Sequence, residues 1–227
     1  MRDSPTSRAT YSEGNLGSNT ITTQMNKKLL VVQACDDVVA DEVKNIVSQA
    51  SLYGIKTQCE PVLSSQEMSR VLRSGERYDY VYLATHGNDQ SFGTQDSSKF
   101  CMSWMDFSVE ICMSLCTNDD AIFMHSCCRG GLHQVAYTMF GCCPRISYVC
   151  GPRQSLLPHE LVIGFNIFLF NVFARRMDPI VATDKITKAT DLRFQCFDRL
   201  EAEADPIYAD FVSSCQVALN KIAYGKP

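Results

Sequence analysis

The chain has 227 residues, of which 45% are hydrophobic and 20% are charged, and its formal net charge at pH 7 is −4. This length is sufficient for one full-sized domain with a large core, or for two small domains at most. The mild net charge and the lack of a Lys/Arg cluster interleaved with aromatic residues exclude nucleic acid from the expected partners. The composition is that of an ordinary globular protein.

Residues 1–26 are rich in Ser, Thr, Asn and Gly and show no hydrophobic periodicity. This composition predicts a flexible tail, followed by one domain over residues 27–227. The N-terminus carries no apolar segment of the secretory type, so we expect a cytoplasmic protein.

Twelve cysteines are present, and in a cytoplasmic protein we expect them to be reduced thiols, many of them in the core. The close cysteine pairs lack the two-residue gap that is typical of structural zinc sites. We therefore expect neither a metal nor another cofactor. The close pairs are Cys112 with Cys116, Cys127 with Cys128, and Cys142 with Cys143.

Strands and helices alternate along the predicted domain. Apolar runs of strand length are separated by stretches in which apolar residues recur at helical spacing. Such alternation predicts an α/β fold with a mainly parallel sheet and helices on both of its faces. In chain order we expect a strand over residues 28–35, a helix over 39–52, a strand over 55–62, a helix over 64–74, a strand over 78–85, a loop over 88–99, a helix over 105–116, a turn over 118–120 and a strand over 121–127. We then expect a short helix that follows residue 131 and ends near 140, a strand over 146–150, helices over 158–176 and 179–199, and a helix or strand–helix element over 207–224.

The longest apolar stretch covers residues 161–174, with the sequence LVIGFNIFLFNVFA. Its length is well short of the roughly 20 residues that a membrane-spanning helix needs. It also contains Asn166 and Asn171, and Arg175 and Arg176 follow it, as suits the C-terminus of a helix. We therefore predict a buried core helix and no membrane partner.

Two predicted strands end at a reactive residue that glycine follows. The first ends in His86-Gly87, and the second in Cys128, with two glycines shortly after it. Ligands of open α/β sheets bind outside the carboxyl ends of the strands, so both residues can share one crevice. An imidazole beside a thiol raises its thiolate fraction and can later return the proton. We predict that Cys128 is a nucleophile, that His86 is its base, and that the N–H groups of Gly87 and Cys128 form an oxyanion hole.

Several neighbouring residues have two interpretations. Cys127 is the alternative nucleophile, although strand alternation points it to the face opposite its neighbour. His125 lies inside the same strand, where we expect it in the core or packed behind the site. Trp104 and Phe107 either line a substrate cleft or belong to the core.

Both strand ends match short motifs of a known family. In caspases one strand ends in His-Gly, and a later one in Gln-Ala-Cys followed by Arg or Gln and then Gly. In bacterial CHAT domains the second motif often reads Ser-Ala-Cys-x-x-Gly. This chain has His86-Gly87 and the sequence SCCRGG over residues 126–131, and 42 positions separate His86 from Cys128, against about 50 in caspases. The pattern thus resembles the caspase-like cysteine peptidases, which include caspases, metacaspases and CHAT domains.

The resemblance covers about residues 28–200. It implies a caspase-like three-layer sandwich and a cysteine endopeptidase that acts on a protein or peptide substrate, with His86 and Cys128 as its dyad. Lone domains of this kind in bacteria are often effectors of signalling or antiphage defence, which implies an activating partner protein or a small-molecule signal. The predicted loop over 88–99 is a candidate activation or self-cleavage element. The chain departs from the family in having cysteine at position 127, where alanine is usual, and serine at 126, where caspases have glutamine and metacaspases aspartate.

The family's substrate pocket is lined by residues at the ends of the first, fourth and fifth strands. A pocket with arginine favours an acidic substrate side chain, and a pocket with aspartate favours a basic one. Both preferences remain open at this point, because the chain offers residues of each kind. The candidates are Asp36, Asp37, Ser126 and Arg153.

A different class of protein shares part of the pattern. Residues 28–87 carry an acidic pair after the first strand, as a response-regulator receiver does. A receiver places its phosphorylated aspartate at the end of the third strand and a lysine after the fifth. This chain has Thr85-His86 and Gly151-Pro152-Arg153 there instead. The alternative function is therefore a catalytically silent signalling or scaffold domain, of either the caspase fold or the receiver-like kind.

Overall fold

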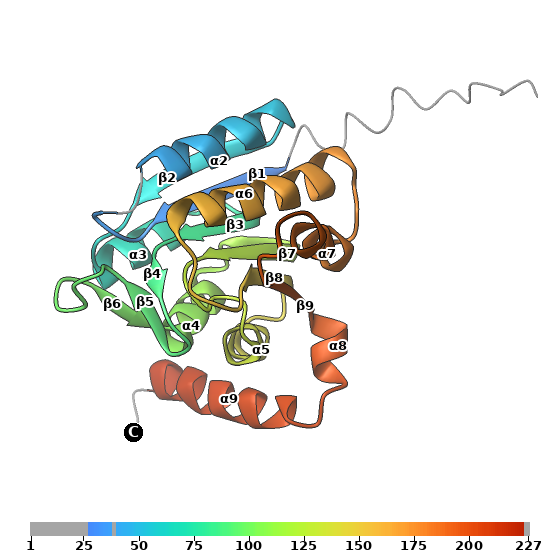
Figure 1. The fold of residues 1–227 in the computed structure, drawn as a ribbon. Coiled ribbons are helices and arrows are strands. Elements are labelled where there is room, and N and C mark those ends of the chain that lie inside the picture. Colours follow the sequence, from blue (N-terminus) through green and yellow to red (C-terminus); the bar gives the residue numbers. More distant parts are fainter. Residues whose placement is uncertain (1–26, 38–39, 225–227) are drawn as a thin grey trace, which may run out of the picture.

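The computed structural model describes residues 27–37 and 40–224, so the predicted tail over 1–26 lies outside the described residues. A six-stranded sheet in the order β2-β1-β3-β7-β8-β9 forms the centre of the molecule (Figure 1). Its first five strands are mutually parallel, and β9 runs antiparallel to β8. The strands of this sheet are β1 (Lys28–Gln33), β2 (Lys56–Pro61), β3 (Tyr78–Ala84), β7 (Thr117–Ser126), β8 (Ile146–Pro152) and β9 (Phe194–Asp198).

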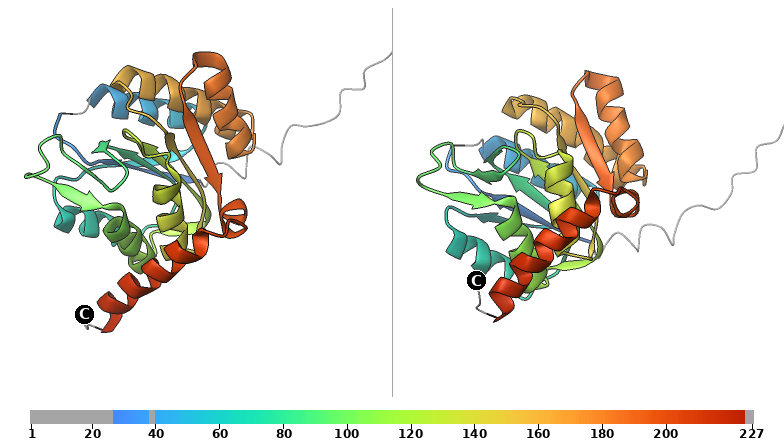
Figure 2. Two further views of the ribbon diagram at one scale, coloured as in Figure 1. Left: turned by 60° about the horizontal axis from the view of Figure 1, so that its bottom comes forward. Right: turned by 90° about the horizontal axis from the view of Figure 1, so that it is seen from below.

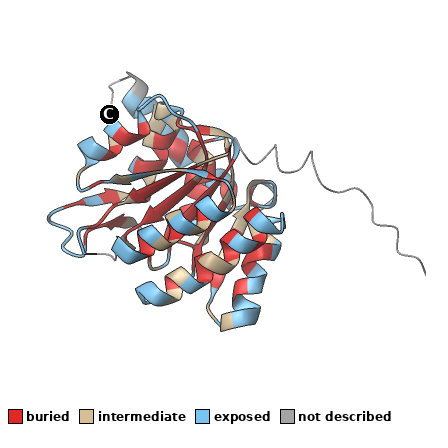
Figure 3. Cartoon of the chain, turned by 90° about the horizontal axis from the view of Figure 1, so that it is seen from above, coloured by how far each residue is buried: buried red, intermediate tan, exposed pale blue. Residues whose placement is uncertain are grey.

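Helices cover both faces of the sheet, which makes three layers (Figures 1 and 3). On one face α2, α6 and α7 pack against the strands, and on the other α3, α4 and α5 do so. Helix α9 lies along α5 and α4 and adds to the second layer (Figure 2). The predicted α/β architecture with a mainly parallel sheet is thus confirmed. The helices are α2 (Ala40–Leu52), α3 (Ser65–Leu72), α4 (Trp104–Ser114), α5 (His133–Cys142), α6 (Pro158–Leu169), the π-helical turn η1 (Phe170–Ala174), α7 (Pro179–Thr190), α8 (Arg199–Glu203) and α9 (Tyr208–Tyr224).

The apolar run of β1 shows why the strands adopt this arrangement. Residues 29–32 are fully buried, and they alternate between the two cores that flank the sheet. Leu30 and Val32 face the α3/α4/α5 side, while Leu29 and Val31 face the α2/α6/α7 side. A strand covered on both faces needs a continuous apolar run, which is the pattern that the sequence has.

The predicted loop over 88–99 is wrong in part. Residues Ser91–Gly93 form β5, which pairs antiparallel with β4 (His86–Gly87) and with β6 (Cys101–Ser103) to make a small second sheet. Phe92 anchors this sheet in the core. Strands of two or three residues carry no readable periodicity, so the sequence pattern could not predict them.

The predicted helix over 179–199 is also wrong beyond residue 190. Helix α7 ends there, with Asp191 in the left-handed conformation, and the chain returns as β9 along β8. Phe194 and Cys196 point into the core between more exposed neighbours, which is the alternation of an edge strand. Asp198 then caps α8 by accepting hydrogen bonds from two backbone N–H groups.

The long apolar stretch is a core element, as predicted. It forms all but the first turn of α6 and the turn η1, and Phe165, Phe168 and Phe173 are buried against the sheet. Within the described ranges, no helix has the length and apolar character needed to cross a membrane.

Strand β8 passes very close to the turn that follows β7. The N–H of Gly131 donates a hydrogen bond of 2.9 Å to the carbonyl oxygen of Pro152. A Cβ atom added to Gly131 would lie 2.0 Å from the carbonyl oxygen of Gly151, and one added to Gly151 would lie 2.7 Å from the carbonyl carbon of Gly130. The turn that carries Cys128 is therefore held against β8 by a contact that admits only glycine.

We expect Gly131→Ala to lower the free energy of unfolding by about 2–3 kcal/mol, because the new methyl group forces two backbones apart. Urea denaturation measures this loss. Gly54→Ala is the control, since Gly54 has a φ of +74° but open space around it, and it should lose only about 1 kcal/mol from the conformational strain. Equal losses in the two variants would contradict the assigned contact.

Candidate active site

The register of β3 and β7 brings the two predicted catalytic turns together. Ala84 pairs with Ser126, and the N–H of Thr85 donates to the carbonyl oxygen of Ser126 at 3.2 Å. His86 and Cys128 each follow two residues beyond that last pair. Since both strands run in the same direction, their turns leave the sheet at the same edge.

The side chain of Cys127 fills the contact between these turns. A Cβ atom on Gly87 would lie 2.9 Å from its Sγ atom, and one on Gly130 would lie 2.8 Å from it. Cys127 is only 1% exposed, and burial raises the pKa of its thiol far above the ordinary value. Because a buried neutral thiol cannot reach a substrate, Cys127 is a packing residue.

Cys128 occupies the tip of the second turn. It is half-buried, and its Sγ atom lies 3.9 Å from the carbonyl oxygen of Leu156. The next residue, Arg129, has a φ of +61°, a left-handed conformation that costs a residue with a Cβ atom about 1 kcal/mol. This sharp turn redirects the chain directly after Cys128 instead of continuing the strand.

The backbone of this turn leaves one donor available. Carbonyl oxygens accept hydrogen bonds from the N–H groups of Arg129, Gly130 and Gly131. Among the described residues none accepts from the N–H of Cys128, so this group is able to bind an oxyanion. Gly87, the other predicted donor, lies across the turn contact against Cys127.

The imidazole of His86 is paired with a carboxylate. Its Nε2 atom lies 3.0 Å from Oδ1 and 3.1 Å from Oδ2 of Asp37, and the two side chains are 39% and 40% exposed. In the described part of the chain no hydrogen bond joins the His86 ring to the Cys128 thiol. A carboxylate that accepts from Nε2–H leaves the lone pair on Nδ1, the nitrogen then able to take a proton. Asp37, predicted as a pocket residue, is thus a direct partner of the predicted base.

The remaining pocket candidates are spread over the site. Asp36 pairs with Lys99 at 2.8 Å, and this hydrogen bond lowers the pKa of Asp36. Both acids line an open groove of about 450 Å³, together with residues near 95–99. Ser126 is buried, whereas Arg153 is exposed at the end of β8. The structure therefore brings Asp36 and Asp37 together and leaves the other two candidates outside this groove.

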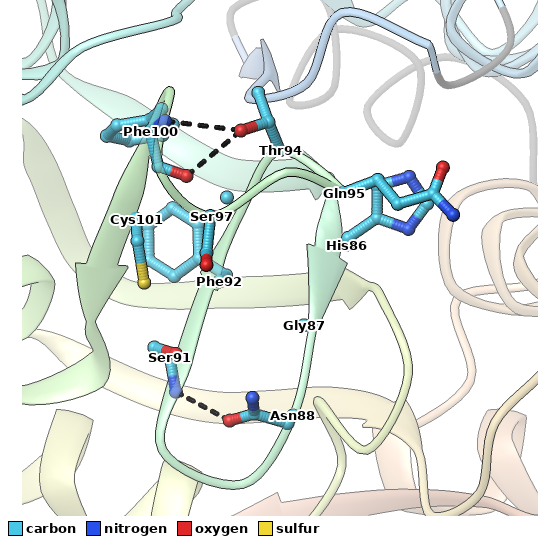
Figure 4. A pocket seen from close by; sticks show the side chains of 11 residues that line it. His86, Gly87, Asn88, Ser91, Phe92, Thr94, Gln95, Ser97, Phe100 and Cys101 are labelled. Carbon is cyan, nitrogen blue, oxygen red and sulfur yellow. Dashed lines mark hydrogen bonds between the residues drawn. The ribbon is translucent and has the colours of Figure 1, made fainter.

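A second cavity lies beside His86, in the part of the chain expected to be a loop. Its volume is about 290 Å³, and β4, β5 and β6 form its walls (Figure 4). Asn88 shapes one end by accepting a hydrogen bond from the N–H of Ser91, and Thr94 bonds to Phe100 at the other (Figure 4). The cavity is lined by His86, Gly87, Asn88, Ser91, Phe92, Gly93, Thr94, Gln95, Ser97, Phe100 and Cys101.

Glu42 is a site residue that the sequence analysis did not identify. Its side chain is 1% exposed, and its Oε1 atom accepts hydrogen bonds from Ser126 Oγ at 2.6 Å and from Tyr82 Oη at 2.7 Å. Its Oε2 atom is buried without a partner among the described residues. Burial raises the pKa of this carboxyl. An acid in the first turn of a helix is a normal capping feature, so its sequence position gave no signal.

His125 and Trp104 pack beneath both turns. His125 is fully buried, and its Nδ1–H donates to the carbonyl oxygen of Gly130 at 3.2 Å. Its ring lies 4.7 Å from the ring of Trp104, at an angle of 32°. Burial lowers the pKa of His125 to about 4, so the ring is neutral at physiological pH. Of the interpretations that the sequence left open, the core position is confirmed for His125, Trp104 and Phe107.

No metal site is visible in the ranges that the structure covers, where no three His, Cys, Asp or Glu side chains are arranged to hold an ion. All twelve cysteines are free thiols.

No protein-family model matches the chain, and no curated protein sequence matches it.

His125 makes stability depend on pH. The unfolded ring takes up a proton below its ordinary pKa of 6.5, whereas the folded ring does so only near 4. The unfolded state thus binds more protons in this interval, and stability falls as the pH falls. Between pH 7 and pH 4 we expect the wild type to lose about 3 kcal/mol more than His125→Phe, as measured by urea unfolding. Parallel pH profiles for the two proteins would show that the ring is not sealed.

The contribution of Glu42 to stability has the opposite pH dependence. Its raised pKa means that the folded state holds a proton above the ordinary value of 4.5, so its contribution is present at low pH and is lost as the pH rises. Glu42→Gln keeps an oxygen acceptor and cannot ionise. We expect this variant to gain stability relative to the wild type on going from pH 4 to pH 8, while the exposed control Glu203→Gln shows no such gain. A constant difference across the range would refute the assignment.

Proposed function

We propose that this protein is a cysteine endopeptidase of the caspase-like type, with Cys128 as nucleophile and His86 as base. The observation that carries the proposal is the contact between their two turns around Cys127, at the carboxyl edge of the sheet. This contact seals one cysteine in the core and leaves its neighbour, Cys128, half-buried at the sheet edge that also carries His86, whose imidazole is paired with a carboxylate.

The proposed reaction is acyl transfer. His86 Nδ1 takes the proton from Cys128, and the thiolate attacks the carbonyl carbon of the substrate peptide bond. The N–H groups of Gly87 and Cys128 stabilise the oxyanion that forms. The carbon–nitrogen bond then breaks as the imidazolium gives its proton to the departing amine. Water, deprotonated by His86, hydrolyses the thioester and restores the free thiol.

Asp37 has a defined part in this sequence. A carboxylate bonded to the far nitrogen of an imidazole fixes the tautomer and stabilises the imidazolium that the first step creates. The distances of 3.0 and 3.1 Å to Nε2 suit this role. The side chain is therefore assigned to orientation of the base, which leaves Asp36 as the acidic pocket candidate nearest to the site.

The wider role follows from the resemblance. The three-layer arrangement and the SCCRGG motif support a caspase-like domain, acting in the cytoplasm as a regulated effector of bacterial signalling or antiphage defence. The separation of His86 from the Cys128 thiol supports control by an activator, either a partner protein or a small molecule. Activation would then bring the two side chains into hydrogen-bond contact.

The same separation favours the second candidate function. A catalytically silent signalling or scaffold domain has no need for contact between imidazole and thiol, and the structure has none in its described part. The two functions differ in a single measurable property, which is cleavage that depends on Cys128.

We expect Cys128→Ala to lower peptide cleavage by about 1,000-fold or more, because the substitution removes the proposed nucleophile. Its unfolding midpoint should stay within error of the wild type. Cys127→Ala is the matched control: it should keep cleavage activity and lose about 1 kcal/mol of stability to the cavity between the turns. Profiling a peptide library with all three proteins measures activity and charge preference together.

Three other outcomes would contradict parts of this proposal. Full activity in Cys128→Ala would exclude the proposed nucleophile. Activity lost in Cys127→Ala but kept in Cys128→Ala would move the nucleophile by one residue. A wild type that cleaves no peptide in the library, alone or with candidate activators, would favour the silent domain.

A further inference from the structure

The two turns of the proposed site are connected underneath by a pair of aromatic rings. Trp104 begins α4, and its indole Nε1–H donates to the carbonyl oxygen of Asn88 at 2.9 Å. Asn88 stands two residues after His86. Trp104 thus holds the segment that follows the proposed base.

The second ring holds the other turn. The Nδ1–H of His125 donates to the carbonyl oxygen of Gly130, which stands two residues after Cys128. A Cβ atom on Gly130 would lie 2.6 Å from the Cβ atom of His125, so this turn rests directly on the histidine. His125 therefore contacts the nucleophile turn by both a hydrogen bond and close packing.

The two rings lie against each other, with centroids 4.7 Å apart. A continuous connection therefore runs from the carbonyl of Asn88 through Trp104 and His125 to the carbonyl of Gly130. The side chains of both rings are buried, and a low-dielectric surrounding strengthens a hydrogen bond that is made. The ring of His125 is neutral above pH 5. A shift of the pH around neutrality therefore leaves the connection intact.

We propose that Trp104 and His125 are positioning residues, which fix the separation of the two turns that carry His86 and Cys128. The inference rests on the proposed function, because it assigns these residues to the same dyad. Neither ring touches the substrate. Their effect is geometric, and a displacement of about 1 Å in a catalytic group can lower a rate 100-fold.

Three variants separate the parts of this connection. Trp104→Phe keeps a ring against His125 and removes the donor to Asn88. His125→Phe keeps a ring against Trp104 and removes the donor to Gly130. His125→Asn restores a donor near the position of Nδ1 without the ring. Phe107→Leu is the control, since Phe107 packs in the same aromatic cluster and bonds to neither turn.

The first measurement is the rate at which iodoacetamide alkylates Cys128, followed by peptide mass spectrometry from pH 5 to pH 9. The exposed Cys59 and Cys101 serve as internal references. We expect the part of the rate that depends on His86, defined with His86→Ala, to fall about tenfold in Trp104→Phe and His125→Phe. It should be unchanged in Phe107→Leu and partly restored in His125→Asn.

The second measurement is peptide cleavage, where kcat should fall about tenfold or more with KM unchanged, because the substrate does not contact the rings. If both Phe variants match Phe107→Leu in alkylation and cleavage, the inference is overturned. If the wild type cleaves nothing, the proposed function fails on its own, and alkylation still decides the inference: a Cys128 rate that does not depend on His86, or that the Phe variants leave unchanged, overturns it.

Discussion

The candidate site depends on how closely two strand-end turns pack around the side chain of Cys127. Gly87 and Gly130 face its sulfur from opposite turns, at distances that leave no room for a Cβ atom. Interiors are packed at this density throughout, and the side chain of Cys127 fills the space between the two turns. The adjacent Cys128 is half-buried beside this contact.

The sheet explains why this contact forms at all. β3 and β7 are neighbours and parallel, so the chain leaves both strands at the same edge. Burial of both faces of the sheet fixes the register, since a shift by one residue would exchange the side chains of the two cores. The backbone of Gly151 in β8 lies directly against the backbone of Gly130 and Gly131. This contact ties the turn after β7 to β8. The position of Cys128 is thus set by three strands, and the position of His86 by β3 and the small second sheet.

The parts that could be predicted are those with a local signal. The long apolar runs of β1, β3, β7 and β8 and the helical spacing between them predicted the layers, and parallel pairing predicted that the chain leaves β3 and β7 at the same edge. The strands of the second sheet are too short for periodicity, and β9 exists because β8 offers a partner distant in sequence. Glu42 lies 40 residues from Tyr82 and 84 from Ser126, so nothing local marks it as buried beneath the site. The place of Asp37 after the first strand predicted it as a pocket residue. Its contact with His86 joins residues 49 positions apart, so no local pattern indicated it.

Two histidines within one small region show how burial separates structural and chemical roles. His125 is sealed, and since desolvation disfavours its charged form, it acts as a fixed neutral donor. Its Nε2 atom has no hydrogen-bond partner among the described residues, which costs free energy of folding. The Nδ1 bond to Gly130 and the stack on Trp104 are the contacts that hold the ring at this position. The side chain of His86 is only partly covered, and it lies beside the carboxylate of Asp37. The buried ring of His125 acts on the site through the turn on which it packs, by its hydrogen bond to Gly130.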